Sequence, residues 1–139
     1  MRARTWILVA ATAVCCAAPA TAQLAPALEY AWSLNLQAFN KEDVTGAMAA
    51  IDSRSPDYDA TKAALTAQFK DLDVKAEQVK FTYMGHDDEF AVARVKTKTT
   101  GQPGSGFADN VTDAIVLFHQ ENGTWKIWSE EIVAVELIP

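Results

Sequence analysis

Cysteine is scarce in this 139-residue chain, and both copies lie near its N-terminus. Cys15 and Cys16 are neighbours within one apolar run, and residues 23–139 contain none. A disulfide framework and a nucleophilic cysteine are therefore excluded from residues 23–139. A domain formed by this part of the chain has to be stabilised by its apolar core alone.

Long apolar runs are equally scarce, because residues 6–18 form the only one. This run is shorter than the roughly 20 residues that a membrane-spanning helix needs. Arg2 and Arg4 precede it, and Ala-Thr-Ala at positions 20–22 gives the small-x-small pattern of a signal-peptide cleavage site. We predict that residues 1–22 are a cleavable signal peptide.

The predicted mature chain, residues 23–139, is long enough for one domain with an apolar core. We expect this chain to be periplasmic or secreted. The segment Thr-Ala-Val before Cys15 does not match the Leu-Ala-Gly-like segment that precedes a lipid-anchoring cysteine. We therefore expect no membrane attachment after cleavage.

Basic side chains are outnumbered by acidic ones, 12 against 18, for a net charge of −6. Without Arg2 and Arg4 the count is 10 against 18, a net charge of −8. Such a charge disfavours nucleic acids and anionic membranes as partners, so we expect neither. The chain also lacks a glycine-rich phosphate loop and a Ser-His-Asp order, which are typical of two large classes of enzyme.

The first half of the predicted domain has the apolar spacing of three helices. The first carries apolar residues at three- and four-residue steps, namely Leu28, Ala31, Trp32, Leu36 and Phe39. Asp43 is placed to cap a short second helix. Ser55 and Pro56 are expected to begin the third helix as its N-cap and first turn. Its predicted buried stripe comprises Tyr58, Thr61, Leu65, Phe69 and Leu72.

The second half is predicted to form four antiparallel strands, around residues 79–84, 90–100, 110–120 and 125–136. Asn122-Gly123 is the strongest signal for a two-residue hairpin turn, since both positions favour a positive φ. From this turn, a regular register pairs Phe118 with Ile127, Val116 with Ser129 and Ala114 with Glu131. On the opposite face the same register pairs Leu117 with Trp128, Ile115 with Glu130 and Asp113 with Ile132.

Both faces of this predicted sheet are apolar, whereas three helices can cover only one of them. The uncovered face would present Ile115, Leu117, Trp128 and Ile132 to solvent. We therefore expect a homodimer that forms through these four residues.

Two segments carry a family resemblance: Leu-Gln-Ala-Phe-Asn-Lys-Glu-Asp-Val at positions 36–44 and Glu-Asn-Gly-Thr-Trp-Lys-Ile at positions 121–127. With the element order, they resemble the nuclear-transport-factor-2-like superfamily, and most closely its bacterial SnoaL-like branch. The resemblance implies an α+β cone: three N-terminal helices packed in the concave face of a curved four-stranded antiparallel sheet. It also implies one such domain over residues 23–139, with a pocket at the open end. Members include isomerases, dehydratases, epoxide hydrolases, ligand binders and subunits without catalysis.

The candidate site residues follow from the predicted register. Glu131 would lie on the concave side, where burial would raise its pKa and suit it to act as a general base or ligand acceptor. The alternatives are a residue at the solvent-exposed rim or an ion pair with Arg94. Tyr30 on the first helix is a candidate proton donor. The predicted pocket lining comprises Trp32, Asn35, Val116, Phe118 and Ser129.

No cofactor is expected. The polar turn Gly-His-Asp-Asp-Glu at positions 85–89 lacks the convergent ligand spacing of a zinc or calcium site, so we interpret it as a solvated turn and predict no metal. His119 is expected on the convex side of the sheet, opposite Lys126.

Three hypotheses for function remain open from the sequence. The first is an exported domain that binds a small hydrophobic molecule or a partner without chemistry. The second is an isomerase, lyase or hydrolase acting on a small hydrophobic substrate, with Glu131 as base and Tyr30 as donor. The third is a structural dimer whose cone is filled by side chains.

Overall fold

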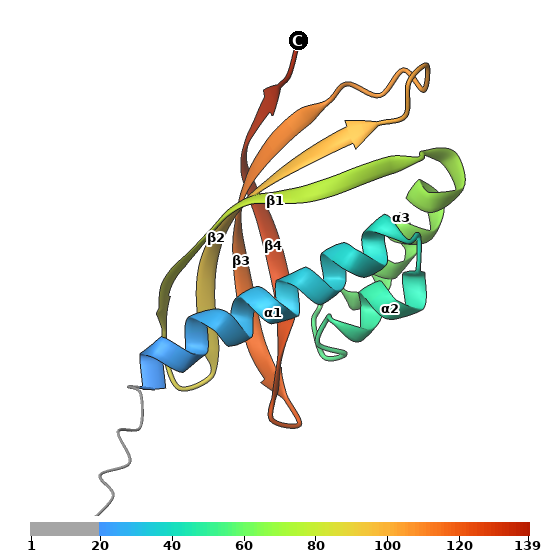
Figure 1. Cartoon of the computed structure of the whole chain (residues 1–139). Helices are drawn as coiled ribbons and strands as arrows, with labels where there is room; N and C mark the ends of the chain where they lie inside the picture. Colours follow the sequence, from blue (N-terminus) through green and yellow to red (C-terminus); the bar gives the residue numbers. More distant parts are fainter. Residues whose placement is uncertain (1–19) are drawn as a thin grey trace, which may run out of the picture.

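The computed structural model describes residues 20–139, so that most of the predicted signal peptide lies outside the described residues. Three helices precede four strands (Figure 1): α1 (Ala20–Asn40), α2 (Val44–Ala49), α3 (Tyr58–Asp71), β1 (Val74–His86), β2 (Phe90–Gly101), β3 (Asn110–Glu121) and β4 (Thr124–Leu137). The strands form one antiparallel sheet in the order β1-β2-β3-β4. The predicted α+β architecture is confirmed. Within residues 20–139, no helix is long and apolar enough to cross a membrane.

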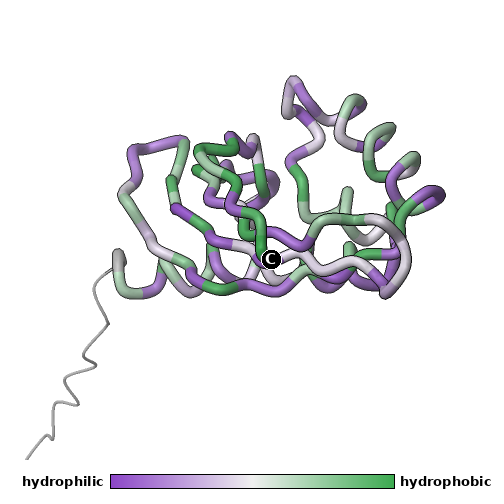
Figure 2. Tube along the Cα trace, turned by 90° about the horizontal axis from the view of Figure 1, so that it is seen from above, coloured by the Kyte–Doolittle hydropathy of each residue, from purple (hydrophilic) through white to green (hydrophobic). Residues whose placement is uncertain are grey.

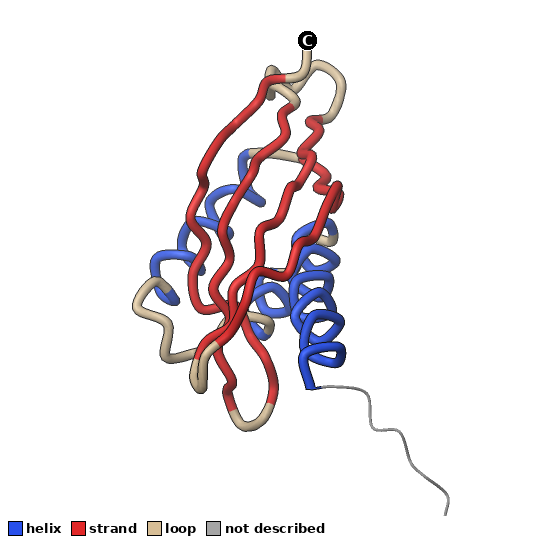
Figure 3. Tube along the Cα trace, turned by 90° about the vertical axis from the view of Figure 1, so that its left-hand side faces the viewer, coloured by secondary structure: helices blue, strands red, loops and turns tan. Residues whose placement is uncertain are grey.

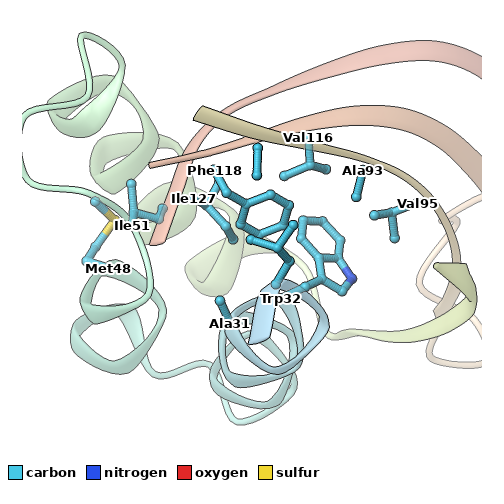
Figure 4. Packing of buried hydrophobic residues seen from close by; sticks show 11 residues of the cluster. Ala31, Trp32, Met48, Ile51, Ala93, Val95, Val116, Phe118 and Ile127 are labelled. Atoms are coloured by element: carbon cyan, nitrogen blue, oxygen red, sulfur yellow. The ribbon is translucent and has the colours of Figure 1, made fainter. Parts of the chain in front are cut away.

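The helices lie on one side of the curved sheet (Figure 3), and we call this side the concave face and the other the convex face. Leu28, Ala31 and Trp32 of α1 are buried in one cluster with the concave residues Val116 and Phe118. In Figure 4 the Trp32 ring extends from α1 toward the sheet beside Phe118. Hydrophobic and hydrophilic residues are interspersed along the helices and the strands (Figure 2).

The short second helix begins as predicted, because the Asp43 side chain accepts a hydrogen bond from the Gly46 N–H at 2.9 Å. The predicted start of the third helix is wrong by two residues. Ser55 is not the N-cap of α3; its hydroxyl accepts a hydrogen bond from the Asp57 N–H at 3.2 Å and donates to the Trp128 carbonyl at 2.6 Å. Asp57 occupies the N-cap position of α3.

The predicted stripe of α3 is only half-buried, and none of the residues Tyr58–Asp71 is fully buried. The helix therefore does not pack tightly on the sheet. Open space remains between α3 and the concave face, and the candidate site lies there.

The last hairpin begins as predicted. Asn122 and Gly123 have φ angles of 51° and 78°, which suit the two-residue turn. Gln120 pairs with Trp125, and Phe118 pairs with Ile127. The sequence correctly places the turn and the pairs that follow it.

Beyond Phe118 the predicted register is wrong, because β4 contains two β-bulges. Leu117 pairs with Ser129, so that Trp128 is an extra residue, and a second irregularity lies between Ala114 and Asp113. Each bulge opposes two residues to one on the neighbouring strand and so shifts every later residue by one position. The observed pairs are Val116 with Glu130, Ile115 with Glu131, Ala114 with Ile132 and Asp113 with Ala134.

The segment between α2 and α3 is bonded to β4. The Asp52 N–H donates to the Ile127 carbonyl at 2.8 Å, and the Ile127 N–H donates to the Ala50 carbonyl at 2.9 Å. With the hydrogen bond from Ser55 to Trp128, these contacts fix the chain at the edge of the sheet immediately before α3 starts. They therefore set the position of one wall of the space beneath α3.

Candidate functional site

A cavity of about 550 Å³ lies between the helices and the concave face. Its volume falls within the roughly 300–1,000 Å³ of typical small-molecule sites. Residues from α1 and α3 form its helical walls: Trp32, Asn35, Leu36, Phe39, Ala60, Thr61, Ala64, Leu65 and Gln68. The other lining residues belong to the loop before α3 and to the sheet: Ile51, Ser55, Asp57, Ala76, Thr97, Thr99, Thr112, Ile127, Trp128, Ser129 and Glu130.

The cavity exists because the residues that face it are small or polar. Ala60 and Ala64 of α3 and Ala76 of β1 each present only a methyl group. On the sheet, the concave positions change from the buried Val95 to threonine at position 97 and beyond. These small side chains leave the volume between the sheet and α3 unfilled.

Three threonines give the floor of the cavity its hydroxyl groups. Thr97 and Thr112 face each other across β2 and β3, and Thr99 lies two residues further along β2. The Thr112 hydroxyl donates to the Thr97 carbonyl at 3.3 Å. Hydroxyl oxygens retain lone pairs, so this floor can also accept hydrogen bonds from a ligand.

Glu130 is the acidic group of the sheet that lines the cavity. The bulge at Trp128 places it opposite Val116, on the concave face. Among the described residues, its carboxylate has no hydrogen-bond or ion-pair partner, and burial raises its pKa above the ordinary value. The residue keeps an exposed surface because it faces the open volume of the cavity.

A second carboxylate, that of Asp57, lines the same cavity from the start of α3. The hydrogen bond from Ser55 to the Trp128 carbonyl joins the two walls here. Asp57 follows Ser55 by two residues, and Glu130 follows Trp128 by two residues. The acidic groups therefore belong to adjoining parts of the lining.

Trp32 contributes both an apolar surface and an unsatisfied polar atom. The residue is 5% exposed, and its indole Nε1 is buried without a hydrogen-bond partner in the described part of the chain. Buried N–H groups are rarely left unpaired, because their desolvation costs free energy. A bound molecule or a water beside this wall would remove that cost.

The structure separates the predicted site residues into two groups. Trp32, Asn35 and Ser129 line the cavity. Val116 and Phe118 are fully buried in the core, and they do not contribute to the lining. Their side chains belong to the buried cluster between β3 and α1.

The predicted placement of Glu131 on the concave side is wrong. Because of the bulge, Glu131 pairs with Ile115 on the convex face, and its neighbour Glu130 takes the position in the cavity. Arg94 is not its partner either, since Arg94 forms a two-contact ion pair with Asp113 at 2.8 Å. No feature of the sequence signalled the bulge.

Tyr30 also lies away from the cavity, with 64% of its surface exposed. It is two residues from both Leu28 and Trp32, which are buried, and two residues along a helix turn a side chain to the other face. The helical spacing of these residues therefore explains why Tyr30 lies on the outer side of α1, and the prediction that it acts in the site is wrong. It does not share a cavity with Glu130.

The four residues predicted for a dimer interface do not form one surface. Ile115 and Leu117 are half-buried on the convex face, and the Trp128 ring lies 5.0 Å from the His119 ring and 5.5 Å from the Phe90 ring. Ile132 pairs with Ala114 and therefore lies on the concave side, 58% exposed. The predicted register paired Ile132 with Asp113 and so placed it on the convex face with Ile115, Leu117 and Trp128; that placement is wrong.

A cluster that the sequence did not reveal fastens the loop before α3 to the sheet. The Asp52 side chain is fully buried and accepts hydrogen bonds from Arg54 Nε and Nη2 at 3.0 and 2.9 Å. His119 Nδ1 lies 2.8 Å from the same carboxylate. Burial would raise the pKa of Asp52, but the hydrogen bonds from Arg54 and His119 outweigh it and hold the pKa far below its usual range.

This cluster is a positioning element and not a part of the cavity. None of its three residues, Asp52, Arg54 and His119, is among the described cavity lining. His119 pairs with Lys126 across β3 and β4, as predicted. The cluster joins the loop to β3, while Ser55 joins it to β4.

The fold and the cavity together define the class of this protein. Three helices over the concave face of an open four-stranded antiparallel sheet form the nuclear-transport-factor-2-like α+β fold. A family model described as the C-terminal domain of the anti-sigma-I factor RsgI9 matches residues 31–138, and the chain belongs to this family.

Solved structures share the fold at low sequence identity. A protein of unknown function from Mycobacterium tuberculosis superposes with a TM-score of 0.71 at 12% identity, over 86% of this chain and 76% of that one. A putative scytalone dehydratase from Novosphingobium aromaticivorans gives 0.68 at 11%, over 84% and 88%. A nuclear-transport-factor-2-like protein of unknown function from Pseudomonas putida gives 0.67 at 13%, over 81% and 87%. Comparison with curated protein sequences gives no match.

Proposed function

We propose that this protein is a binding domain that takes a small, largely hydrophobic molecule into the cavity beneath α3. The observation that carries the proposal is the cavity itself, about 550 Å³ in volume and lined by apolar side chains such as Trp32, Leu36 and Phe39 together with an equal number of polar ones. A cavity of this volume with aromatic walls is typical of small-molecule sites. A cone filled by side chains would not leave such a volume, which counts against a purely structural role.

Two further observations support binding. The buried Nε1 of Trp32 lacks a partner within the described residues, and an acceptor on a ligand or a water would satisfy it. The family is named for a domain of an anti-sigma factor, which is a regulatory protein. A domain that recognises a molecule without transforming it suits such a protein.

The test is native mass spectrometry of the gently purified protein, combined with thermal shifts across a panel of hydrophobic ligands. Ala64→Trp should fill the cavity and abolish both the co-purifying mass and the thermal shift, because Ala64 lines the cavity. Ala63→Trp is the matched control, since Ala63 is exposed on the same helix, as Ala64 is, but is not part of the cavity lining. Absence of any ligand from the wild-type protein in both assays, or unchanged binding by Ala64→Trp, would refute the proposal.

A second function, proton abstraction from a bound substrate, is favoured by the raised pKa of Glu130. A carboxylate of raised pKa is a better base near neutral pH. Tyr30 cannot serve as its donor, because it lies outside the cavity. If the protein is an enzyme, it should convert the co-purifying molecule to a product that mass spectrometry detects, and Glu130→Gln should not.

We also infer that a second copy of the chain covers the convex face. Val92 pairs with Leu117 there, and Ile115 and Trp128 continue the apolar surface. Arg94 and Asp113 mark the edge of this apolar area with an ion pair. The expected interface therefore differs from that predicted from sequence by the loss of Ile132.

A further inference from the structure

We propose that the molecule bound in the cavity is an organic cation, with an apolar body and a protonated amine or quaternary ammonium group that pairs with Glu130. The inference rests on the proposed binding function and adds the charge of the ligand. It follows from the charges, the pairing of the carboxylates and the apolar walls of the cavity.

The charges of the lining are all of one sign. Among the residues that the structure describes, the lining includes the carboxylates of Glu130 and Asp57 and no lysine, arginine or histidine. An anionic ligand would have to lose its hydration beside two like charges, without a counter-charge from the lining. A cation would meet attraction in the same place.

Glu130 differs from the other carboxylates that are held within the fold. Asp52 is paired with Arg54, Asp113 with Arg94, and Glu121 with Lys126. Within residues 20–139, Glu130 has no such partner, although it lines the cavity and is partly desolvated there. A carboxylate in that position is costly until a cation pairs with it. An ammonium group on the ligand would supply the missing partner.

The rest of the cavity suits the remainder of such a molecule. Trp32 and Phe39 provide aromatic surface, which attracts an organic cation as well as apolar groups. The hydroxyl oxygens of Thr97, Thr99 and Thr112 can accept hydrogen bonds from an N–H group. The lining therefore offers negative charge, hydrogen-bond acceptors and apolar contact within one cavity.

The experiment compares three probes that share one body and differ in charge: decyltrimethylammonium, decanol and decanoate, each measured by isothermal titration calorimetry at pH 7.5. Decyltrimethylammonium should bind the full-length protein most tightly and decanoate most weakly. Glu130→Gln should weaken binding of the cation by about tenfold, the size expected of one partly buried ion pair, and leave decanol unchanged.

Glu131→Gln is the matched control, because it removes the same charge from the neighbouring residue on the convex face. It should leave the affinity for the cation unchanged. If both variants weaken cation binding equally, the effect reports the net charge of the protein, and the proposal is overturned. Decanol or decanoate binding as tightly as the cation would also overturn it while leaving the binding function intact. If none of the three probes binds, the proposed function itself fails.

Discussion

Glu130 and Glu131 are chemically identical neighbours, yet they lie on opposite faces of the sheet. The side chain at position 130 meets the cavity, and its pKa is raised by burial. Sequence alternation assigned that environment to position 131. The error is one residue, and at this scale one residue decides which carboxylate can touch a ligand.

Because the pKa of Glu130 is higher in the folded chain, the folded state binds more protons than the unfolded state between the two pKa values. Stability therefore falls as pH rises above about 4.3, the ordinary pKa of glutamate, through the folded pKa. Glu130→Gln removes this loss. The variant should be more stable than wild type at pH 7.5, by at most about 1 kcal/mol because cavity water screens the charge.

Thermal unfolding of both proteins at pH 4 and pH 7.5 measures this effect. The difference in melting temperature should be present at pH 7.5 and disappear at pH 4. Glu131→Gln, the same substitution on the convex face, serves as the control. A Glu130→Gln variant that is less stable than wild type at pH 7.5 would mean that an unseen partner stabilises the ionised carboxylate.

At the scale of elements, the loop between α2 and α3 has a larger role than its sequence indicates. Asp52 ties this loop to β3 through Arg54 and His119, and Ser55 ties it to β4. These bonds hold the first turn of α3 beside the sheet while the rest of the helix stands away from it. The cavity is therefore bounded at this end by a fixed loop.

Asp52→Asn should destabilise the fold by about 2–3 kcal/mol, because it removes a fully buried charge from its hydrogen-bonded partners. Urea unfolding at pH 7 measures this loss, with Asp88→Asn in the exposed β1–β2 turn as the control. The pKa of Asp52 is depressed, so its contribution is present above about 3.9 and is lost as pH falls further. The difference in the free energy of unfolding between wild type and Asp52→Asn should become smaller at acidic pH. Equal stability of the two variants at pH 7 would contradict the role of the cluster.

Periodicity predicted most of the elements, because their apolar faces meet one core. The spacing of Leu28, Ala31 and Trp32 identified α1, Asp43 identified the start of α2, and Asn122-Gly123 fixed the last turn. The bulges escaped prediction because β4 reads as a regular strand, and bulges arise from how strands twist against each other. The cluster around Asp52 escaped because His119 lies more than 60 residues from Asp52 and Arg54 in sequence.

The whole molecule presents two faces with different roles. The concave face carries the cavity, and the convex face carries apolar residues that no helix covers (Figure 3). A surface of that kind is typical of an interface. The proposed dimer and the proposed site therefore lie on opposite sides of one sheet, so a variant at one should leave the other intact.

Leu117→Glu should convert the dimer to monomers by placing a charge within the proposed interface. It is a cleaner substitution than one at Trp128, whose ring also packs on His119. Thr82→Glu is the matched control, since Thr82 pairs with Arg94 on the charged part of the same face. Sedimentation equilibrium gives the mass of each protein. An identical mass for wild type and Leu117→Glu would show that this face does not hold a second copy.

An NMR titration locates the bound ligand on the molecule. Backbone amide shifts are followed by two-dimensional NMR while decyltrimethylammonium is added to the protein. Saturable changes should cluster on the cavity lining, around Trp32, Thr97, Leu65 and Glu130. Changes confined to the convex face around Leu117, or no saturable change in the lining, would contradict binding in the cavity.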